Sequence, residues 1–271
     1  MLIQITNRCR MGCPHCMEDG RPDGRHMDSA MFDKALAFSL AVSANVVVVG
    51  GAEPTEHLLF LDFCKKVSDA GLLFTICSNG MWLGDAAKER DVESLASLPG
   101  YTGMQVYSNP KYYRLFNEIV AAYRRNEARW AAAKAILDTS PIINMNDLGR
   151  AARCPAALEE MARHRYHQPC LTAHLAARQT GSFRDFCAVM CAQGHFCTPM
   201  IDIDGGFHAS EAWMCQSFGN VATDSPDAVW ERFRASRPCC KCALGRRFLE
   251  EQTPKMAAVR KILGFNKEGD E

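Results

Sequence analysis

The sequence predicts an α/β fold in which a parallel sheet or barrel is covered by helices. The clearest sign is the segment 45–49, where four consecutive valines are followed by Gly50 and Gly51. A strand without polar alternation is typical of a parallel sheet with helices on both faces. Strand-like and helical stretches also alternate along the first half of the chain, with connections long enough for right-handed crossovers.

The individual elements follow from hydrophobic spacing and from residues that start or stop helices. Asp28 and Ser29 offer a helix N-cap, and apolar residues follow them at helical spacing as far as Val42. We expect strands at 2–6, 45–49, 72–77, 103–107 and 141–145, and further helices at 55–70, at 85–98 and in an Ala- and Arg-rich segment that reaches about 137. A β-hairpin is predicted at 199–210, turning on Gly205 and Gly206.

Bulk composition excludes several classes of function. The 271 residues include 31 basic and 31 acidic side chains without a long run of one sign, so we expect no nucleic-acid partner. The sequence contains neither a signal peptide nor an apolar run that could span a membrane, so we expect no membrane partner and a cytoplasmic location. Fourteen cysteines in such a chain favour metal or redox chemistry over a disulfide scaffold.

The cysteines Cys9, Cys13 and Cys16 form a Cys-x-x-x-Cys-x-x-Cys run directly behind the first predicted strand. Closed zinc sites and ferredoxin clusters take four ligands, so three neighbouring thiolates indicate an iron–sulfur cluster with one iron open to another molecule. A structural zinc site or unrelated thiols are the alternative interpretation.

This run resembles the cysteine motif of the radical S-adenosylmethionine (SAM) superfamily. The resemblance implies a [4Fe–4S] cluster whose free iron is chelated by the amino and carboxylate groups of SAM. It also implies a SAM-site role for His15, because the residue before the third cysteine is often aromatic in that superfamily.

A second motif follows the valine strand, where Gly50, Gly51, Glu53 and Pro54 match the superfamily segment that binds the SAM amino group. Glycines without side chains let a ligand approach the backbone, and a carboxylate can accept bonds from an ammonium group. The alternative is a simple tight turn. Ser78, Asn79 and Ser108 follow the third and fourth predicted strands, where related enzymes place polar groups around the methionine carboxylate and the ribose of SAM; ordinary turn residues are the alternative there.

A block of cysteines near the C-terminus resembles the twitch subdomain of radical SAM enzymes, a short form of the SPASM domain. Cys197 and Cys215 flank the predicted hairpin, and Cys239 and Cys242 form a Cys-x-x-Cys pair. The resemblance implies one auxiliary [4Fe–4S] cluster held by these four thiolates. Cys240 is an alternative to Cys239, and a four-cysteine zinc site is an alternative to the cluster. Two further thiols, Cys187 and Cys191, remain unplaced.

With the resemblance, the predicted fold becomes a partial (β/α)6 barrel of the TIM type with a small C-terminal domain that contains the hairpin. The predicted units are the barrel at 1–186, the auxiliary-cluster domain at 187–250, and a C-terminal helix and tail at 251–271.

The resemblance implies an enzyme, a radical SAM oxidoreductase or maturase. An external donor of the flavodoxin or ferredoxin type would supply an electron, SAM would be cleaved to a 5′-deoxyadenosyl radical, and the radical would take a hydrogen atom from the substrate. The auxiliary cluster would accept an electron from the substrate or orient it, and we favour the first role.

A peptide or protein substrate is preferred. Because the chain starts at the first predicted strand, a peptide maturase is expected to need a separate recognition protein. A dehydrogenase of an aminocyclitol or sugar-like metabolite and a zinc-stabilised interaction module are the alternatives. No residue is assigned as catalytic.

Overall fold

The computed structural model describes residues 1–42, 44–110, 113–139, 148–156, 158–159, 169–195, 198–210, 214–240 and 242–265. Within these residues one sheet has the strand order β5-β4-β3-β2-β1-β6-β7-β8. Strands β1 to β6 pair in parallel, and β7 and β8 are antiparallel additions at one edge. The strands are β1 (Leu2–Thr6), β2 (Val46–Gly51), β3 (Leu73–Ser78), β4 (Tyr101–Tyr107), β5 (Ala135–Asp138), β6 (Met200–Ile201), β7 (Gly206–His208) and β8 (Ser217–Asn220).

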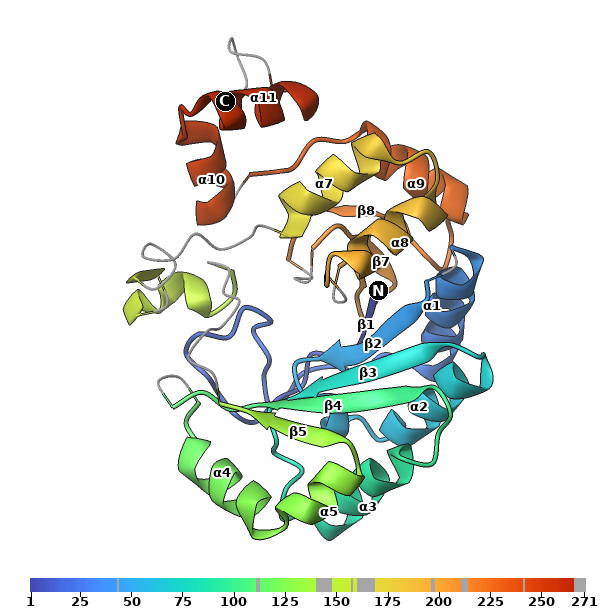
Figure 1. Cartoon of the computed structure of the whole chain (residues 1–271), viewed down its shortest axis with the longest axis vertical. Coiled ribbons are helices and arrows are strands. Elements are labelled where there is room, and N and C mark those ends of the chain that lie inside the picture. Colours follow the sequence, from blue (N-terminus) through green and yellow to red (C-terminus); the bar gives the residue numbers. More distant parts are fainter. Residues whose placement is uncertain are drawn as a thin grey trace.

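Helices follow most strands and cover the outer face of the sheet (Figure 1). They are α1 (Ser29–Ala41), η1 (Pro54–Glu56), α2 (Phe60–Asp69), α3 (Ala86–Leu95), α4 (Phe116–Arg125), α5 (Glu127–Ala132), η2 (Ala151–Arg153), α7 (Pro169–Gln179), α8 (Phe183–Ala192), α9 (Pro226–Ala235), α10 (Ala243–Glu250) and α11 (Pro254–Ile262). The sheet ends at β5 and β8 without pairing to each other, so it is an open, partial barrel. No helix in the described ranges is both long and apolar enough to cross a bilayer.

Successive side chains along each strand point alternately to the helix-covered face and to the interior of the open barrel. In β2, Val47 and Val49 join the main core with the helices, whereas Val48 packs on the other face with Leu2 and Met200. The valine run is therefore buried on both faces, as the sequence predicts. This interior face ends at the carboxyl ends of the strands. Parallel folds place their ligand sites there.

A single apolar core joins the barrel strands to the C-terminal part of the chain. Phe38 of α1 contacts Phe183 of α8 and Phe207 of β7, with ring centroids 5.8 and 6.0 Å apart. Trp230 of α9 stacks on Phe183 at 5.3 Å. The predicted domain boundary at 186/187 falls inside α8, whose aromatic residues belong to this shared core.

The first four predicted strands and the cap of α1 are confirmed. Asp28 accepts a hydrogen bond from the Met31 amide at 2.7 Å, which starts α1 at Ser29. The predicted helix at 55–70 is interrupted, because η1 ends at Glu56 and α2 starts at Phe60.

The fifth strand differs from the prediction. Strand β5 occupies Ala135–Asp138, where the sequence predicts the end of a helix. The chain reverses at Lys134, whose φ is 53°, and Ile136 then pairs with Gln105 of β4. Pairing at the sheet edge overrides the helix propensity of this Ala- and Leu-containing segment. The predicted strand at 141–145 lies outside the described residues.

The predicted hairpin is present and has a second role. Strands β6 and β7 pair antiparallel, with Ile201 opposite Phe207. Strand β6 also pairs in parallel with β1, so it supplies the sixth parallel strand that the sequence does not reveal. The hairpin thereby places the C-terminal cysteine segment beside the barrel.

Candidate functional site

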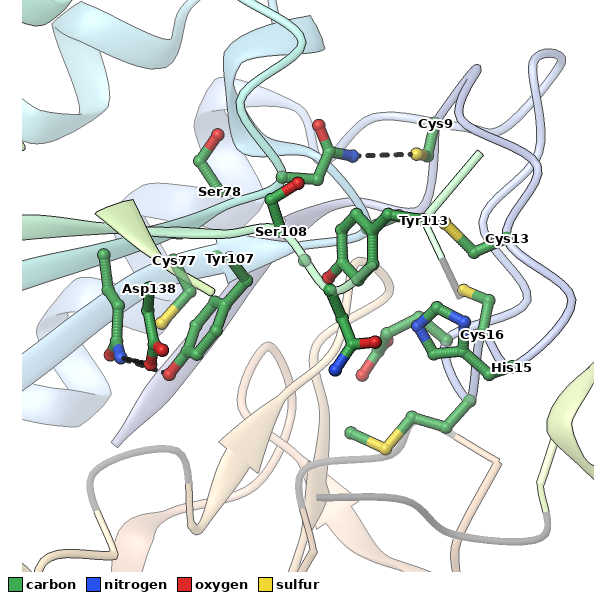
Figure 2. A pocket seen from close by; sticks show the side chains of 18 of the residues that line it. Cys9, Cys13, His15, Cys16, Cys77, Ser78, Tyr107, Ser108, Tyr113 and Asp138 are labelled. Atoms are coloured by element: carbon green, nitrogen blue, oxygen red, sulfur yellow. Dashed lines mark hydrogen bonds between the residues drawn. The ribbon is translucent and has the colours of Figure 1, made fainter. Parts of the chain in front are cut away.

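A cavity of about 460 Å³ lies at the carboxyl ends of strands β1 to β5, within the size range of small-molecule sites. Figure 2 shows the thiols of the cysteine loop and His15 on one side, with Tyr107 and Asp138 on the other. Nine residues predicted to hold a cluster or SAM line this cavity: Cys9, Cys13, His15, Cys16, Gly50, Gly51, Ser78, Asn79 and Ser108. Glu53 and Pro54, also predicted, are not among its lining residues.

The three thiols of the first motif sit on the loop that follows β1. Burial, then the charges of Glu53 and Cys16, raises the pKa of Cys9 to about 11. Burial, then the neighbouring sulfurs of Cys16 and Cys9, raises the pKa of Cys13 to about 12. Burial likewise raises the pKa of Cys16. The thiols are therefore neutral in the metal-free chain and close enough to repel one another if ionised.

The donor set suits an iron–sulfur cluster better than one metal ion. Among the described residues, no three His, Cys, Asp or Glu side chains converge closely enough to hold a single ion. A four-iron cluster does not need such convergence, because each thiolate binds a different iron. Asn79 donates a hydrogen bond from Nδ2 to the Sγ of Cys9 at 3.3 Å, the kind of contact that tunes a cluster.

Arg150, which also lines the cavity, holds the cysteine loop through hydrogen bonds to its backbone. Its Nε donates to the carbonyl of Cys13 at 2.9 Å, and Nη1 donates to the carbonyl of Gly20 at 2.7 Å. The Arg150 amide also donates to the carbonyl of Cys16 at 3.0 Å. Nη2 is buried without a hydrogen-bond partner among the described residues. The sequence does not single out Arg150, because these contacts join segments more than 100 residues apart.

Arg150→Lys is expected to loosen this loop, because lysine cannot reproduce the planar fork of donors. Losing a hydrogen bond to a charged side chain costs about 1.5–3 kcal/mol, so the free energy of unfolding of the metal-free chain should fall by about that amount. Denaturant titration measures the change. Arg153→Lys is the matched control, since Arg153 is exposed one turn later. Equal effects of the two substitutions on the free energy of unfolding would contradict the role of Arg150 in holding the cysteine loop.

Glu53 lies behind the cavity wall and is fully buried. Its Oε1 accepts from the Thr55 amide and hydroxyl at 3.2 and 2.6 Å. Its Oε2 accepts from the Asn79 amide at 2.8 Å, and the Ser78 hydroxyl donates to both oxygens at 3.0 and 3.1 Å. Glu53 thus positions the Ser78–Asn79 turn, which faces the cavity and contacts Cys9.

The two glycines allow a close approach of the strands themselves. Gly51 has φ 129°, and a Cβ there would lie 2.2 Å from the carbonyl oxygen of Thr6. A Cβ at Gly50 would lie 2.6 Å from the Leu2 side chain, which also lines the cavity. Larger residues at these positions would separate β1 from β2 or fill the cavity floor.

Two polar residues in the wall have properties suited to a polar ligand. The Ser108 hydroxyl is buried in the wall and has no hydrogen-bond partner among the described residues. Burial, and to a smaller degree the Arg150 charge, lowers the pKa of His15 to about 4, so its ring is neutral at neutral pH. The His15 ring contacts the ring of Tyr113 with centroids 5.3 Å apart.

The opposite wall contains residues that sequence patterns do not reveal. Asp138 at the end of β5 accepts from Gln105 Nε2 at 2.7 Å, and Tyr107 donates to Gln105 Oε1 at 2.7 Å. These residues alternate into the barrel from neighbouring strands, which only the register of β4 and β5 shows.

The C-terminal cysteines are partly within the described residues. Sulfurs of Cys239 and Cys242 lie close enough to Cys215 to influence its ionisation, and Cys197 lies outside the described residues. Cys187 and Cys191 lie elsewhere, on α8 beside Met1, around a small pocket of about 10 Å³.

Part of the chain is similar in sequence to known enzymes. A PqqA peptide cyclase of Methylobacterium nodulans is 26% identical over 83 residues, covering 30% of this chain and 22% of that protein. A GTP 3′,8-cyclase of Clostridium perfringens is 30% identical over 93 residues, covering 32% of this chain and 29% of that protein. The matched segment thus spans less than a third of either relative.

Among solved structures, Streptococcus suis SuiB bound to the precursor peptide SuiA gives a TM-score of 0.46 at 12% identity, covering 93% of this chain and 73% of that one. SuiB bound to S-adenosylmethionine gives a TM-score of 0.43 at 11% identity, covering 94% and 74%. The family model described as the radical SAM superfamily matches residues 3–139, just over half of the 271 residues. The chain therefore belongs to the radical SAM superfamily.

Proposed function

We propose that this chain is a radical SAM enzyme that cleaves SAM reductively and abstracts a hydrogen atom from its substrate. The observation that carries the proposal is one cavity of about 460 Å³ that combines three thiols, the diglycine turn and the buried Ser108 hydroxyl. When bound, the cluster and SAM supply one-electron reduction and a 5′-deoxyadenosyl radical.

The chain's own residues bind and orient these groups. Cys9, Cys13 and Cys16 are the proposed cluster ligands. The proposed contacts for SAM are Gly50, Gly51, Ser78, Asn79, Ser108 and His15, with Glu53 and Pro54 holding the turn behind them. Ser108 has a buried hydroxyl with spare hydrogen-bonding capacity, and the neutral His15 ring offers an apolar face, so both suit a nucleoside.

The proposed substrate is a peptide or protein that undergoes oxidative modification. Support comes from the PqqA peptide cyclases, which share 26–28% identity with this chain over 83–100 residues. Proposed partners are an electron donor of the flavodoxin or ferredoxin type and a separate peptide-recognition protein. A cytoplasmic location is part of the same proposal.

A second candidate is a small-molecule substrate. The GTP 3′,8-cyclase, whose name gives a nucleotide substrate, matches at 30% identity over 93 residues. The polar wall of Gln105, Tyr107 and Asp138 offers hydrogen bonds that also suit a hydroxylated metabolite.

We further propose that residues 187–250 contribute an auxiliary cluster site. Cys215, Cys239 and Cys242 are the described thiols of this site, and Cys197 is the sequence-based candidate for the fourth position. The support is that Cys239 and Cys242 lie near enough to Cys215 to influence its ionisation.

Anaerobic reconstitution tests the proposal as a whole. We expect about eight irons per chain for two four-iron clusters, and 5′-deoxyadenosine when reduced protein meets SAM. About four irons per chain would contradict the proposed auxiliary cluster. Zinc alone, without 5′-deoxyadenosine, would contradict the proposed radical SAM activity. A short peptide encoded beside the gene should increase 5′-deoxyadenosine if the substrate is a peptide, whereas stimulation only by hydroxylated metabolites favours the second candidate.

A further inference from the structure

The cavity inside the barrel has two unlike sides. On β1 and β2, Leu2 and Val48 line the cavity and belong to one apolar cluster. On β4 and β5, the lining residues are Gln105, Tyr107 and Asp138. A ligand in the cavity would therefore contact carbon atoms on one side and polar atoms on the other.

The polar side is built by the register of two neighbouring strands. Tyr107 of β4 is paired with Asp138 of β5, and Gln105 lies two residues before Tyr107, on the same face of the sheet. Figure 2 shows Tyr107 and Asp138 together, across the cavity from the thiols of Cys13 and Cys16. The polar side is thus separate from the proposed ligands of the first cluster.

The hydrogen bonds of the polar side run in one direction. The Tyr107 hydroxyl donates its single proton to Gln105 Oε1 at 2.7 Å, and Gln105 Nε2 donates to Asp138 Oδ2 at 2.7 Å. This arrangement fixes the Gln105 amide, because the opposite orientation would place its oxygen against the carboxylate. The chain of donors ends on Asp138, and an ionised carboxylate accepts hydrogen bonds without donating any. The polar side therefore suits a ligand that donates.

The charges around the cavity favour a cationic donor over a neutral one. The described lining residues include two carboxylates, Asp138 and Glu18, and one permanently charged base, Arg150. The Arg150 guanidinium is 3.2 Å from Asp19 and also donates to backbone carbonyls of the cysteine loop. The apolar side of the cavity lowers the effective dielectric constant, which strengthens the attraction between a carboxylate and a cation.

Glu18 is the less suitable of the two carboxylates. It follows Cys16 by two residues and so belongs to the cysteine loop. Its Oε2 accepts a hydrogen bond at 2.6 Å from Nε2 of Gln4, which is fully buried. Asp138 is half-buried at the end of β5, inside the barrel. A cation bound to Asp138 would therefore lie across the cavity from the thiols.

We propose that Asp138, positioned by Gln105 and Tyr107, binds an ammonium group of the substrate. The inference rests on the proposed function, because it assigns a charge to the substrate of the same cavity. A lysine side chain of a peptide and an amino sugar both carry such a group, and the carbon atoms of either would face Leu2 and Val48. Asp138 is then a residue that determines substrate specificity.

Two pairs of probes test the charge preference in the anaerobically reconstituted protein with SAM bound. Isothermal titration calorimetry compares N-acetyl-lysine amide with N-acetyl-norleucine amide, which lacks the amine, and glucosamine with glucose. Because the ammonium group makes a charged hydrogen bond, we expect it to improve affinity about tenfold or more. A preference in the lysine pair indicates a peptide source, and a preference in the sugar pair indicates an amino sugar.

Substitution of each cavity carboxylate locates the preference. Asp138→Asn keeps the size of the side chain and an oxygen that can accept from Gln105, but it removes the charge, so the preference should be lost. Asp138→Glu restores the charge and should recover part of the preference. Glu18→Gln is the matched control, since it removes the other carboxylate of the cavity, and it should retain the preference. Circular dichroism checks that each variant is folded.

The outcomes separate this inference from the proposed function. Equal affinities within both pairs in the parent protein overturn the inference, whether or not Asp138→Asn folds. A preference that survives in Asp138→Asn, or that is lost only in Glu18→Gln, also overturns it. Weaker SAM binding by Asp138→Asn with unchanged probe affinities would assign the polar side to SAM and overturn it as well. If the parent prefers the ammonium probes but forms no 5′-deoxyadenosine from SAM, the proposed function fails and the cation site at Asp138 stands.

Discussion

Replacing Cys13 with alanine is expected to lower the iron content of the reconstituted protein by about four atoms per chain and to abolish 5′-deoxyadenosine formation. Cys13 lines the cavity between Cys9 and Cys16 and is buried. Two thiolates cannot hold a cluster that already lacks a fourth protein ligand. Iron and sulfide analysis, with chromatographic detection of 5′-deoxyadenosine, measures both effects.

Cys64→Ala is the matched control. Cys64 is fully buried in α2, and burial alone raises its pKa above the ordinary range. It packs in the main apolar core and has no place at the cavity. The substitution should lower stability slightly while iron content and 5′-deoxyadenosine stay at parent levels. A Cys13→Ala protein that retains parent iron and still forms 5′-deoxyadenosine would exclude the proposed cluster site.

Local patterns in the sequence explain why the first half of the fold was predictable. Strands β1 to β4 each carry enough apolar residues to be recognised alone, and Asp28 caps α1 as expected. Strand β5 is only four residues long, and strand β6 only two. Elements this short depend on pairing with a neighbour rather than on their own composition, so sequence periodicity does not reveal them.

The candidate site, like the fold, has a part that the sequence predicts and a part that it does not. The cysteine loop and the diglycine turn are contiguous motifs, and the structure places both at one cavity. Arg150 and Asp138 reach the cavity from distant parts of the chain, and nothing in their local sequence indicates it.

Glu53→Gln is expected to destabilise the metal-free chain and to weaken SAM binding together. Glutamine has one oxygen where Glu53 has two, so one of the donors from Thr55, Ser78 or Asn79 loses its acceptor. Leaving a buried donor without its acceptor costs about 1–3 kcal/mol. Because the Asn79 turn also contacts Cys9, the reduced cluster should show an altered EPR signal. Denaturant titration, SAM titration and EPR give the three readouts.

The pH dependence of the free energy of unfolding provides an independent readout of the burial of Glu53. Burial raises the folded-state pKa of Glu53 above its ordinary 4.5, in spite of hydrogen bonds that lower it. The folded state then holds a proton more tightly than the unfolded state. The stabilisation of the folded state by protonated Glu53 is fully present below pH 4.5, and it declines as the pH rises through the folded-state pKa. Glu53→Gln should lack that decline.

Glu93→Gln is the matched control for the same chemical change. Glu93 pairs with Arg129 on the surface, where ion pairs contribute about 0–1 kcal/mol, so stability and SAM affinity should stay near parent values. The three readouts distinguish two possible roles of Glu53. If its carboxylate only contacts the SAM amino group, SAM affinity falls while stability and the EPR signal of the SAM-free cluster stay unchanged. The buried bonds to Thr55, Ser78 and Asn79 predict instead that all three change, because the carboxylate that organises the turn also positions Asn79 on Cys9.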